Sequence, residues 1–266
     1  MLKDSFKNLL KPQKRTESKP DKPLPKNFGA PWRVILNVLL IFVCSQIVAV
    51  FIVELFLSIF KQGQNLGDIL NSSATAQFFY VLFAEGLAAL LTFAIIRRRG
   101  LGPDAIGLGR KPAWRDLKKA AIGFLIFYAL LIAATALVSL LIPSFNVNQK
   151  QDVGFDTLNS TTDGILAFIS LVILPPLGEE TLVRGYLYSG LRASMKFLPA
   201  MLITSLMFGL AHLQLGSGTA ALWAAGLDTF VLSVVLVYLR ESTGALYAGM
   251  LVHMLNNVVA FGVHFH

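Results

Sequence analysis

The stretch from Gly178 to Arg184 places two adjacent carboxylates and a guanidinium inside a strongly apolar half of the sequence. Ionisable side chains in such segments are costly and usually face a protein interior or a wet cavity. Glu180 and Arg184 are four residues apart, so on a helix they share a face and form an ion pair in the favourable order. Glu179 is rotated by roughly 100° from Glu180 at 3.6 residues per turn. Glu179 is therefore free to point into a cavity and act as a general base.

Two histidine segments follow this stretch. Phe208 and His212 are four residues apart in one apolar run, and His253 and Asn257 are four residues apart in the last one. Asn257 can orient the His253 ring or hydrogen-bond a reacting oxygen. Taken singly, each motif is also compatible with a structural polar contact between helices. Convergence of all three on one cavity favours chemistry, because one glutamate and two histidines can hold and deprotonate a water.

The same side chains, Glu179, His212 and His253, match the ligands of a His2Glu metal site with an open position. Other intramembrane chemistries lack their motifs. The sequence has no His-Glu-x-x-His and no Gly-x-Ser-x-Gly, and its only cysteine, Cys44, lies in the first apolar run. These residues leave two mechanisms open. We favour a metal-free, glutamate-activated water, because few other ligands are available and no known zinc helix is present. The alternative is a divalent metal such as zinc, bound by those three side chains.

The elements that must position these residues are long apolar runs. Hydrophobic residues make up 55% of the 266 residues and charged residues only 14%, against about 25% charged in soluble domains. The sequence predicts an all-α polytopic membrane protein of about seven to eight transmembrane or membrane-embedded helices that enclose a polar intramembrane cavity. The proline pair Pro175-Pro176 interrupts the helical hydrogen bonds of the fourth run. This run is therefore either one kinked helix or two helices. The apolar runs cover residues 34–60, 77–96, 120–142, 164–196, 200–213, 220–239 and 245–263.

Basic residues are distributed unevenly between the predicted loops. If the amino terminus is inside and each run crosses once, every Lys and Arg except Lys61, Lys150 and Arg184 falls in an inside segment. This distribution predicts a cytoplasmic amino terminus for an integral membrane protein. We expect the membrane to be the bacterial cell membrane. The distribution also accounts for the net charge of +8 without a nucleic-acid partner. We divide the chain into three parts. Residues 1–33 form a basic, Pro- and Lys-rich disordered tail, residues 34–160 the amino-terminal transmembrane helices, and residues 161–266 the motif-bearing helices.

The three motifs together resemble those of the CPBP intramembrane proteases. This family groups type II CAAX prenyl endopeptidases with bacteriocin-processing and self-immunity proteins. All three motifs occur in order, each in an apolar run. They are Glu179-Glu180-x-x-x-Arg184, Phe208-x-x-x-His212 and His253-x-x-x-Asn257.

The resemblance implies an intramembrane endopeptidase that hydrolyses a peptide bond of a membrane-associated peptide or protein. It implies Glu179 as the water-activating residue, assisted by His212. It further implies that His253 and Asn257 polarise the scissile carbonyl and stabilise the oxyanion. The supporting residues of the motifs are Glu180, Arg184 and Phe208.

Two other functions fit the same sequence. A transporter or proton relay would use acids along a path, and Glu54, Glu85 and Asp228 are further acids in the apolar runs. A non-catalytic scaffold of the same fold would bind a peptide or partner in the cavity. Essential roles for those three acids, and not for the motif histidines, would indicate transport. A failure to cleave membrane-associated peptides would indicate a scaffold.

Overall fold

The computed structural model describes residues 26–60, 73–146, 154–155, 158–213 and 223–265, and within these ranges every regular element is a helix. Thr161–Arg192 forms one long helix, here called the central helix. The other elements are η1 (Lys26–Phe28), α2 (Pro31–Phe60), α4 (Ala74–Arg98), η2 (Pro103–Ile106), α5 (Trp114–Leu141), α9 (Phe197–Ala211), α10 (Trp223–Thr243) and α11 (Tyr247–Phe265).

Within the described residues, six helices are long and apolar enough to cross a membrane, and α9 is a shorter apolar helix. Large apolar side chains cover their outer faces. On α5, for example, Leu125 is 70% and Leu140 is 76% exposed. Extended surfaces of this kind are unfavourable in water, whereas hydrocarbon solvates them well. The part of the chain that the structure describes is therefore all-helical, and its six long apolar helices are those of an integral membrane protein, which confirms the predicted fold class at this level.

The central helix is continuous but contains two π segments. Pro175 and Pro176 have no N–H to donate, and the backbone widens into a π segment just before them. The sequence left open whether this region is one kinked helix or two, and the structure shows one. Its parts are α6 (Thr161–Phe168), the π segment η3 (Ile169–Ile173), α7 (Leu174–Glu179), the π segment η4 (Glu180–Tyr188) and α8 (Ser189–Arg192).

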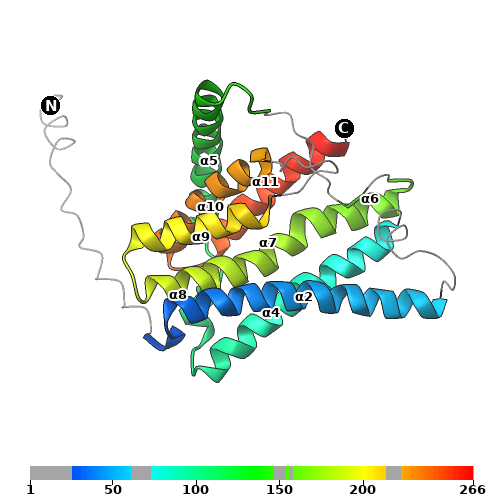
Figure 1. The fold of residues 1–266 in the computed structure, drawn as a ribbon, viewed down its shortest axis with the longest axis horizontal. Coiled ribbons are helices and arrows are strands. Elements are labelled where there is room, and N and C mark those ends of the chain that lie inside the picture. The colour runs from blue at the N-terminus through cyan, green and yellow to red at the C-terminus, as the bar shows by residue number, and fades with distance from the viewer. Residues whose placement is uncertain (1–25, 61–72, 147–153, 156–157, 214–222, 266) are drawn as a thin grey trace, which may run out of the picture.

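The central helix lies between two groups of helices (Figure 1). On one side, α2 packs against α4 and η4, and α4 also packs against α7 and η4. On the other side, α9, α10 and α11 contact the central helix, and α9 packs closely on α10. Helix α5 packs on α10 and α11 and stands at the edge of the molecule. The motif segment of the central helix is therefore in contact with both groups.

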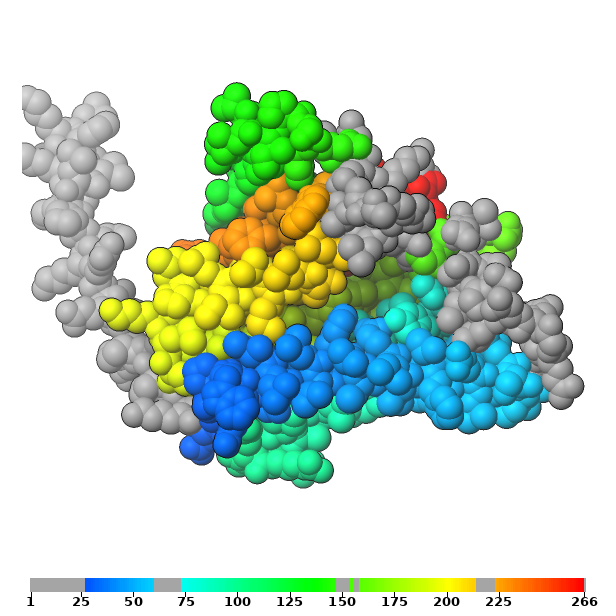
Figure 2. Space-filling model, in the orientation of Figure 1, coloured from blue at the N-terminus to red at the C-terminus, as the bar shows by residue number. Residues whose placement is uncertain are grey.

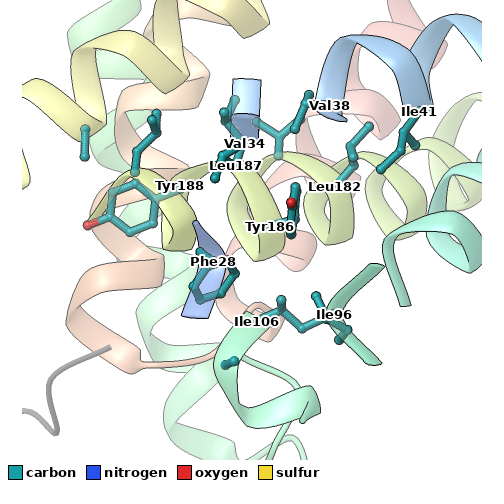
Figure 3. Close-up of a cluster of buried hydrophobic side chains, with 14 of the residues drawn as sticks. Phe28, Val34, Val38, Ile41, Ile96, Ile106, Leu182, Tyr186, Leu187 and Tyr188 are labelled. Atoms are coloured by element: carbon teal, nitrogen blue, oxygen red, sulfur yellow. The ribbon is translucent and has the colours of Figure 1, made fainter. Parts of the chain in front are cut away.

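An apolar cluster surrounds the part of the central helix that follows the motif. Figure 3 shows Tyr186 within this cluster, among side chains from η1, α2, α4 and η2. Phe28 is fully buried with its ring centroid 5.9 Å from that of Tyr186, and Asn37 donates a hydrogen bond of 2.8 Å to the Tyr186 hydroxyl. Residues 1–25 of the predicted tail lie outside the described residues. In the rest of it, Phe28 is packed and α2 already begins at Pro31.

Contacts join the helix ends next to the basic loops at one end of the bundle. These ends belong to α4, α5, the central helix, α10 and α11. The Tyr247 hydroxyl at the start of α11 donates to the carbonyl oxygen of Arg110, between α4 and α5, at 2.6 Å. The buried guanidinium of Arg240 donates to Ser189 Oγ at 3.1 Å and to the carbonyl oxygen of Ala105 at 3.4 Å. These contacts hold the ends predicted to be cytoplasmic on the same side.

The close packing of α9 on α10 depends on Gly209. A Cβ added there would lie 2.9 Å from the carbonyl oxygen of Gly226 and 3.1 Å from Phe230 Cβ. We predict that Gly209→Ala lowers the thermal unfolding temperature in detergent, because such overpacking costs about 1–3 kcal/mol. The matched control is Gly86→Ala on α4, where an added Cβ meets no described atom within 4 Å. The control should be neutral or slightly stabilising, and equal unfolding temperatures for both variants would contradict the prediction.

Candidate active site

Glu180 is the centre of a buried polar cluster formed by the central helix and α11. Its Oε1 accepts hydrogen bonds from Arg184 Nη1 at 2.9 Å and from His253 Nδ1 at 3.1 Å. The side chains of Glu180 and Arg184 are fully buried, and that of His253 is 5% exposed. The ion pair predicted from the spacing is therefore present. It also orients His253, because a ring whose Nδ1–H is held by a carboxylate presents Nε2 on its other side.

The ring of Phe208 covers this cluster from α9. Arg184 Cζ lies 4.1 Å from the ring centroid, which is a cation–π distance. The His253 ring packs edge-on against Phe208 with the centroids 6.0 Å apart. Phe208 therefore keeps the guanidinium in apolar surroundings, where its attraction to Glu180 is stronger than it would be in water.

His212 forms the carboxyl-terminal cap of α9. Its Nδ1 lies 2.9 Å from the carbonyl oxygen of Phe208, one turn earlier. A carbonyl oxygen only accepts, so Nδ1 carries the proton and Nε2 is the nitrogen that can accept one. The His212 ring also packs against the Phe208 ring at 4.5 Å between centroids. This fixes the ring in an orientation suited to accepting a proton at Nε2.

Glu179 is the more accessible of the two adjacent carboxylates. Its side chain is 23% exposed, and its Oε2 lies 3.9 Å from His253 Nε2. Glu179, Phe208 and His212 line a cavity of about 230 Å³ whose opposite wall is formed by residues 38–46 of α2. Figure 2 shows the central helix at the bottom of the hollow between α2 and α9. Motif side chains from two different helices therefore face one space.

Asn257 has a backbone partner that the sequence analysis did not find. Its Nδ2 donates to the carbonyl oxygen of Leu171 at 2.9 Å. In an α-helix this carbonyl would accept from residue 175, and in a π-helix from residue 176. Both residues are prolines. Asn257 thus satisfies an acceptor that the proline pair leaves without its helical donor, and its second amide hydrogen remains for another acceptor.

The three acids that would serve a transport function do not share one surface. Glu54 is exposed on α2, and Asp228 lies on α10 within electrostatic range of His253. Only Glu85 of α4 lines the cavity that contains Glu179. The sequence analysis did not place Glu85 in the site, because its position depends on the packing of α4 against Gly178. The presence of an acid inside an apolar run was the only local signal.

The described residues include no group of three or more His, Cys, Asp or Glu side chains arranged to hold a metal ion. The alternative ligand set of Glu179, His212 and His253 is therefore not assembled as such a group. Nδ1 of each histidine is already hydrogen-bonded, to Phe208 and to Glu180 respectively.

The comparisons with known proteins concern the same part of the chain. A family model described as type II CAAX prenyl endopeptidase Rce1-like matches residues 161–259. No curated protein and no solved structure matches the chain. The matched range contains the central helix, α9 and the part of α11 that carries His253 and Asn257. Residues 161–259 therefore form an Rce1-like domain of the type II CAAX prenyl endopeptidase (CPBP) family, a family of intramembrane proteases.

Proposed function

We propose that this protein is an intramembrane endopeptidase that hydrolyses a peptide bond of a membrane-associated peptide or protein with a glutamate-activated water. The observation that carries the proposal is the division between two adjacent carboxylates. Glu180 is committed to Arg184 and His253, whereas Glu179 faces a cavity together with His212. A purely structural salt bridge accounts for Glu180 but gives no reason for a second carboxylate beside it.

In the proposed mechanism, Glu179 takes one proton from a water in the cavity, and His212 Nε2 accepts a hydrogen bond from the other. The hydroxide attacks the carbonyl carbon of the peptide bond and forms a tetrahedral anion. The oxyanion is stabilised by Nε2–H of protonated His253 and by the second amide hydrogen of Asn257. Glu179 then delivers its proton to the amide nitrogen as the C–N bond breaks, which releases an acid and an amine.

We further propose that the substrate segment reaches the cavity from the bilayer, between α2 and α9. Leu39 and Phe42 line the cavity and are 49% and 43% exposed, so apolar side chains form its rim. An apolar rim favours entry of a membrane-associated segment over a fully hydrated peptide. We also propose, from the distribution of the basic loops, that the amino terminus lies in the cytoplasm.

The two adjacent glutamates provide the main test. We predict that Glu179→Gln lowers kcat by about 10²–10⁴-fold, because the base is lost, and leaves the unfolding temperature unchanged. Its matched neighbour Glu180→Gln should instead destabilise the fold by about 3–5 kcal/mol, because Arg184 loses its buried partner. The measurements are cleavage of a lipid-anchored fluorogenic peptide and thermal unfolding, both with purified protein in detergent.

Two outcomes of this comparison would contradict the proposal. Near-normal cleavage by Glu179→Gln would remove Glu179 from the role of base. Absence of cleavage by the wild type, on a panel of lipid-anchored peptides and on membrane proteins that accumulate in cells carrying Glu179→Gln, would favour a binding scaffold.

The metal-free mechanism has a separate test. We predict that dialysis against a strong chelator leaves cleavage unchanged, because the described residues gather no group of three donors for a metal ion. The measurement is activity before and after chelation, with metal content determined on the same samples. Loss of activity that is restored by zinc would favour the alternative, with Glu179, His212 and His253 as ligands.

A further inference from the structure

Gln46 is a neutral polar side chain near the middle of α2, and it lines the same cavity as Glu179 and His212. A carboxamide at this depth of an apolar membrane helix is costly unless its polar atoms have partners. Gln46 lies outside residues 161–259, so the three motifs do not account for it. Its place in the cavity wall therefore calls for a separate explanation.

The oxygen of this carboxamide is held from α4. The Tyr80 hydroxyl donates a hydrogen bond to Gln46 Oε1, and the Tyr80 ring packs against Val53 and Ala76. Because Tyr80 engages the oxygen, the group left to interact is the amide nitrogen, which has two hydrogens to donate. This nitrogen donates to no residue that the structure describes. Gln46 is thus an oriented donor without a protein acceptor.

The rest of the α2 wall offers no second donor. Val38, Leu39 and Phe42 are apolar. Ser45 donates its hydroxyl hydrogen to the carbonyl oxygen of Phe42 at 2.9 Å, and backbone N–H groups inside an α-helix are used by the helix itself. Of the described α2 residues that line the cavity, Gln46 alone has a side-chain donor left for a bound molecule.

A peptide that enters between α2 and α9 leaves water, so its backbone carbonyl groups need donors inside the cavity. In the proposed mechanism, His253 and Asn257 bind the oxygen of the scissile carbonyl but not those of the neighbouring peptide bonds. The cavity is only about 230 Å³ in volume, so a segment that brings its scissile bond to Glu179 also passes Gln46.

We propose that the Gln46 amide donates a hydrogen bond to the carbonyl oxygen of a substrate peptide bond next to the scissile one, and so positions the substrate opposite Glu179. Tyr80 acts through Gln46 as a positioning residue, because its hydroxyl fixes which end of the carboxamide faces the substrate. This inference rests on the proposed peptidase function.

We predict that Gln46→Leu raises KM by about 5–100-fold and lowers kcat much less, because a hydrogen bond to an unreactive carbonyl is present both before and during the reaction. Tyr80→Phe should raise KM by a smaller factor, since the amide remains but loses its orientation. The measurement is steady-state cleavage of the lipid-anchored fluorogenic peptide by full-length purified protein.

The matched control is Tyr128→Phe. The Tyr128 hydroxyl donates to Asn256 Oδ1 at 3.2 Å and forms a similar tyrosine–amide pair between α5 and α11, but neither residue lines the cavity. The control should leave KM and kcat unchanged.

Modified substrates separate a hydrogen bond from an effect on cavity shape. In each of these peptides, one peptide bond next to the scissile bond is replaced by a trans-alkene, which keeps the shape and removes the carbonyl oxygen. The wild type should lose about 5–100-fold in kcat/KM on one of them, whereas Gln46→Leu should lose less than about threefold on that same peptide, because the hydrogen bond is already absent.

Equal losses in the wild type and in Gln46→Leu, or no loss with any modified peptide in the wild type, would overturn the inference. If Gln46→Leu does not fold, the comparison of Tyr80→Phe with Tyr128→Phe decides, and equal KM values for these two variants would overturn it. An active Glu179→Gln variant would instead refute the peptidase mechanism, while the modified peptides would still report on Gln46, so the two failures are distinguishable.

Discussion

The burial of Glu180 and Arg184 is the constraint on which the rest of the site depends. A charge removed from water is tolerated only when it is paired and hydrogen-bonded. Here the pairing partner is on the same helix, the second hydrogen bond comes from His253 on α11, and the ring over the guanidinium comes from Phe208 on α9. Residues of all three motifs thus meet one electrostatic requirement. The motifs are far apart in the sequence because each lies on a different helix: the central helix, α9 and α11.

The same requirement gives Glu179 its separate role. Because Glu180 is held by Arg184 and His253, its neighbour is left to extend toward the cavity beside α2 and α9. The π segment η4 begins at Glu180, and its wider turn changes the direction of successive side chains at that point. The earlier π segment ends just before the prolines. The prolines leave the carbonyl oxygen of Leu171 without its helical donor, and Asn257 donates to it instead. Asn257, a residue of the third motif, therefore stabilises the backbone that leads into the first motif.

Local patterns predicted the parts of this structure that depend on neighbours in the chain. Hydropathy located the spanning helices, because the cost of placing polar groups in hydrocarbon applies to each segment separately. The spacing of Glu180 and Arg184 predicted their ion pair, because residues four apart on one helix are neighbours on its surface. Contacts between distant segments, such as Asn257 with Leu171 or Phe28 with Tyr186, were not predicted. They depend on which helices become neighbours, and no periodicity within one segment specifies that.

The cavity combines two parts of the chain that have different tasks. Glu179, Phe208 and His212 lie within the range matched by the family, whereas Glu85 and residues 38–46 of α2 lie outside it. In the proposed mechanism, the first set would have the same task for any peptide bond, because the water, the carbonyl group and the leaving amine are the same in each. In the proposed function, the side chains of the substrate would contact the second set, where shape and apolar fit decide between competing peptides. We therefore expect α2 and α4 to determine which membrane peptide is accepted, while the three motifs determine only that it is cleaved.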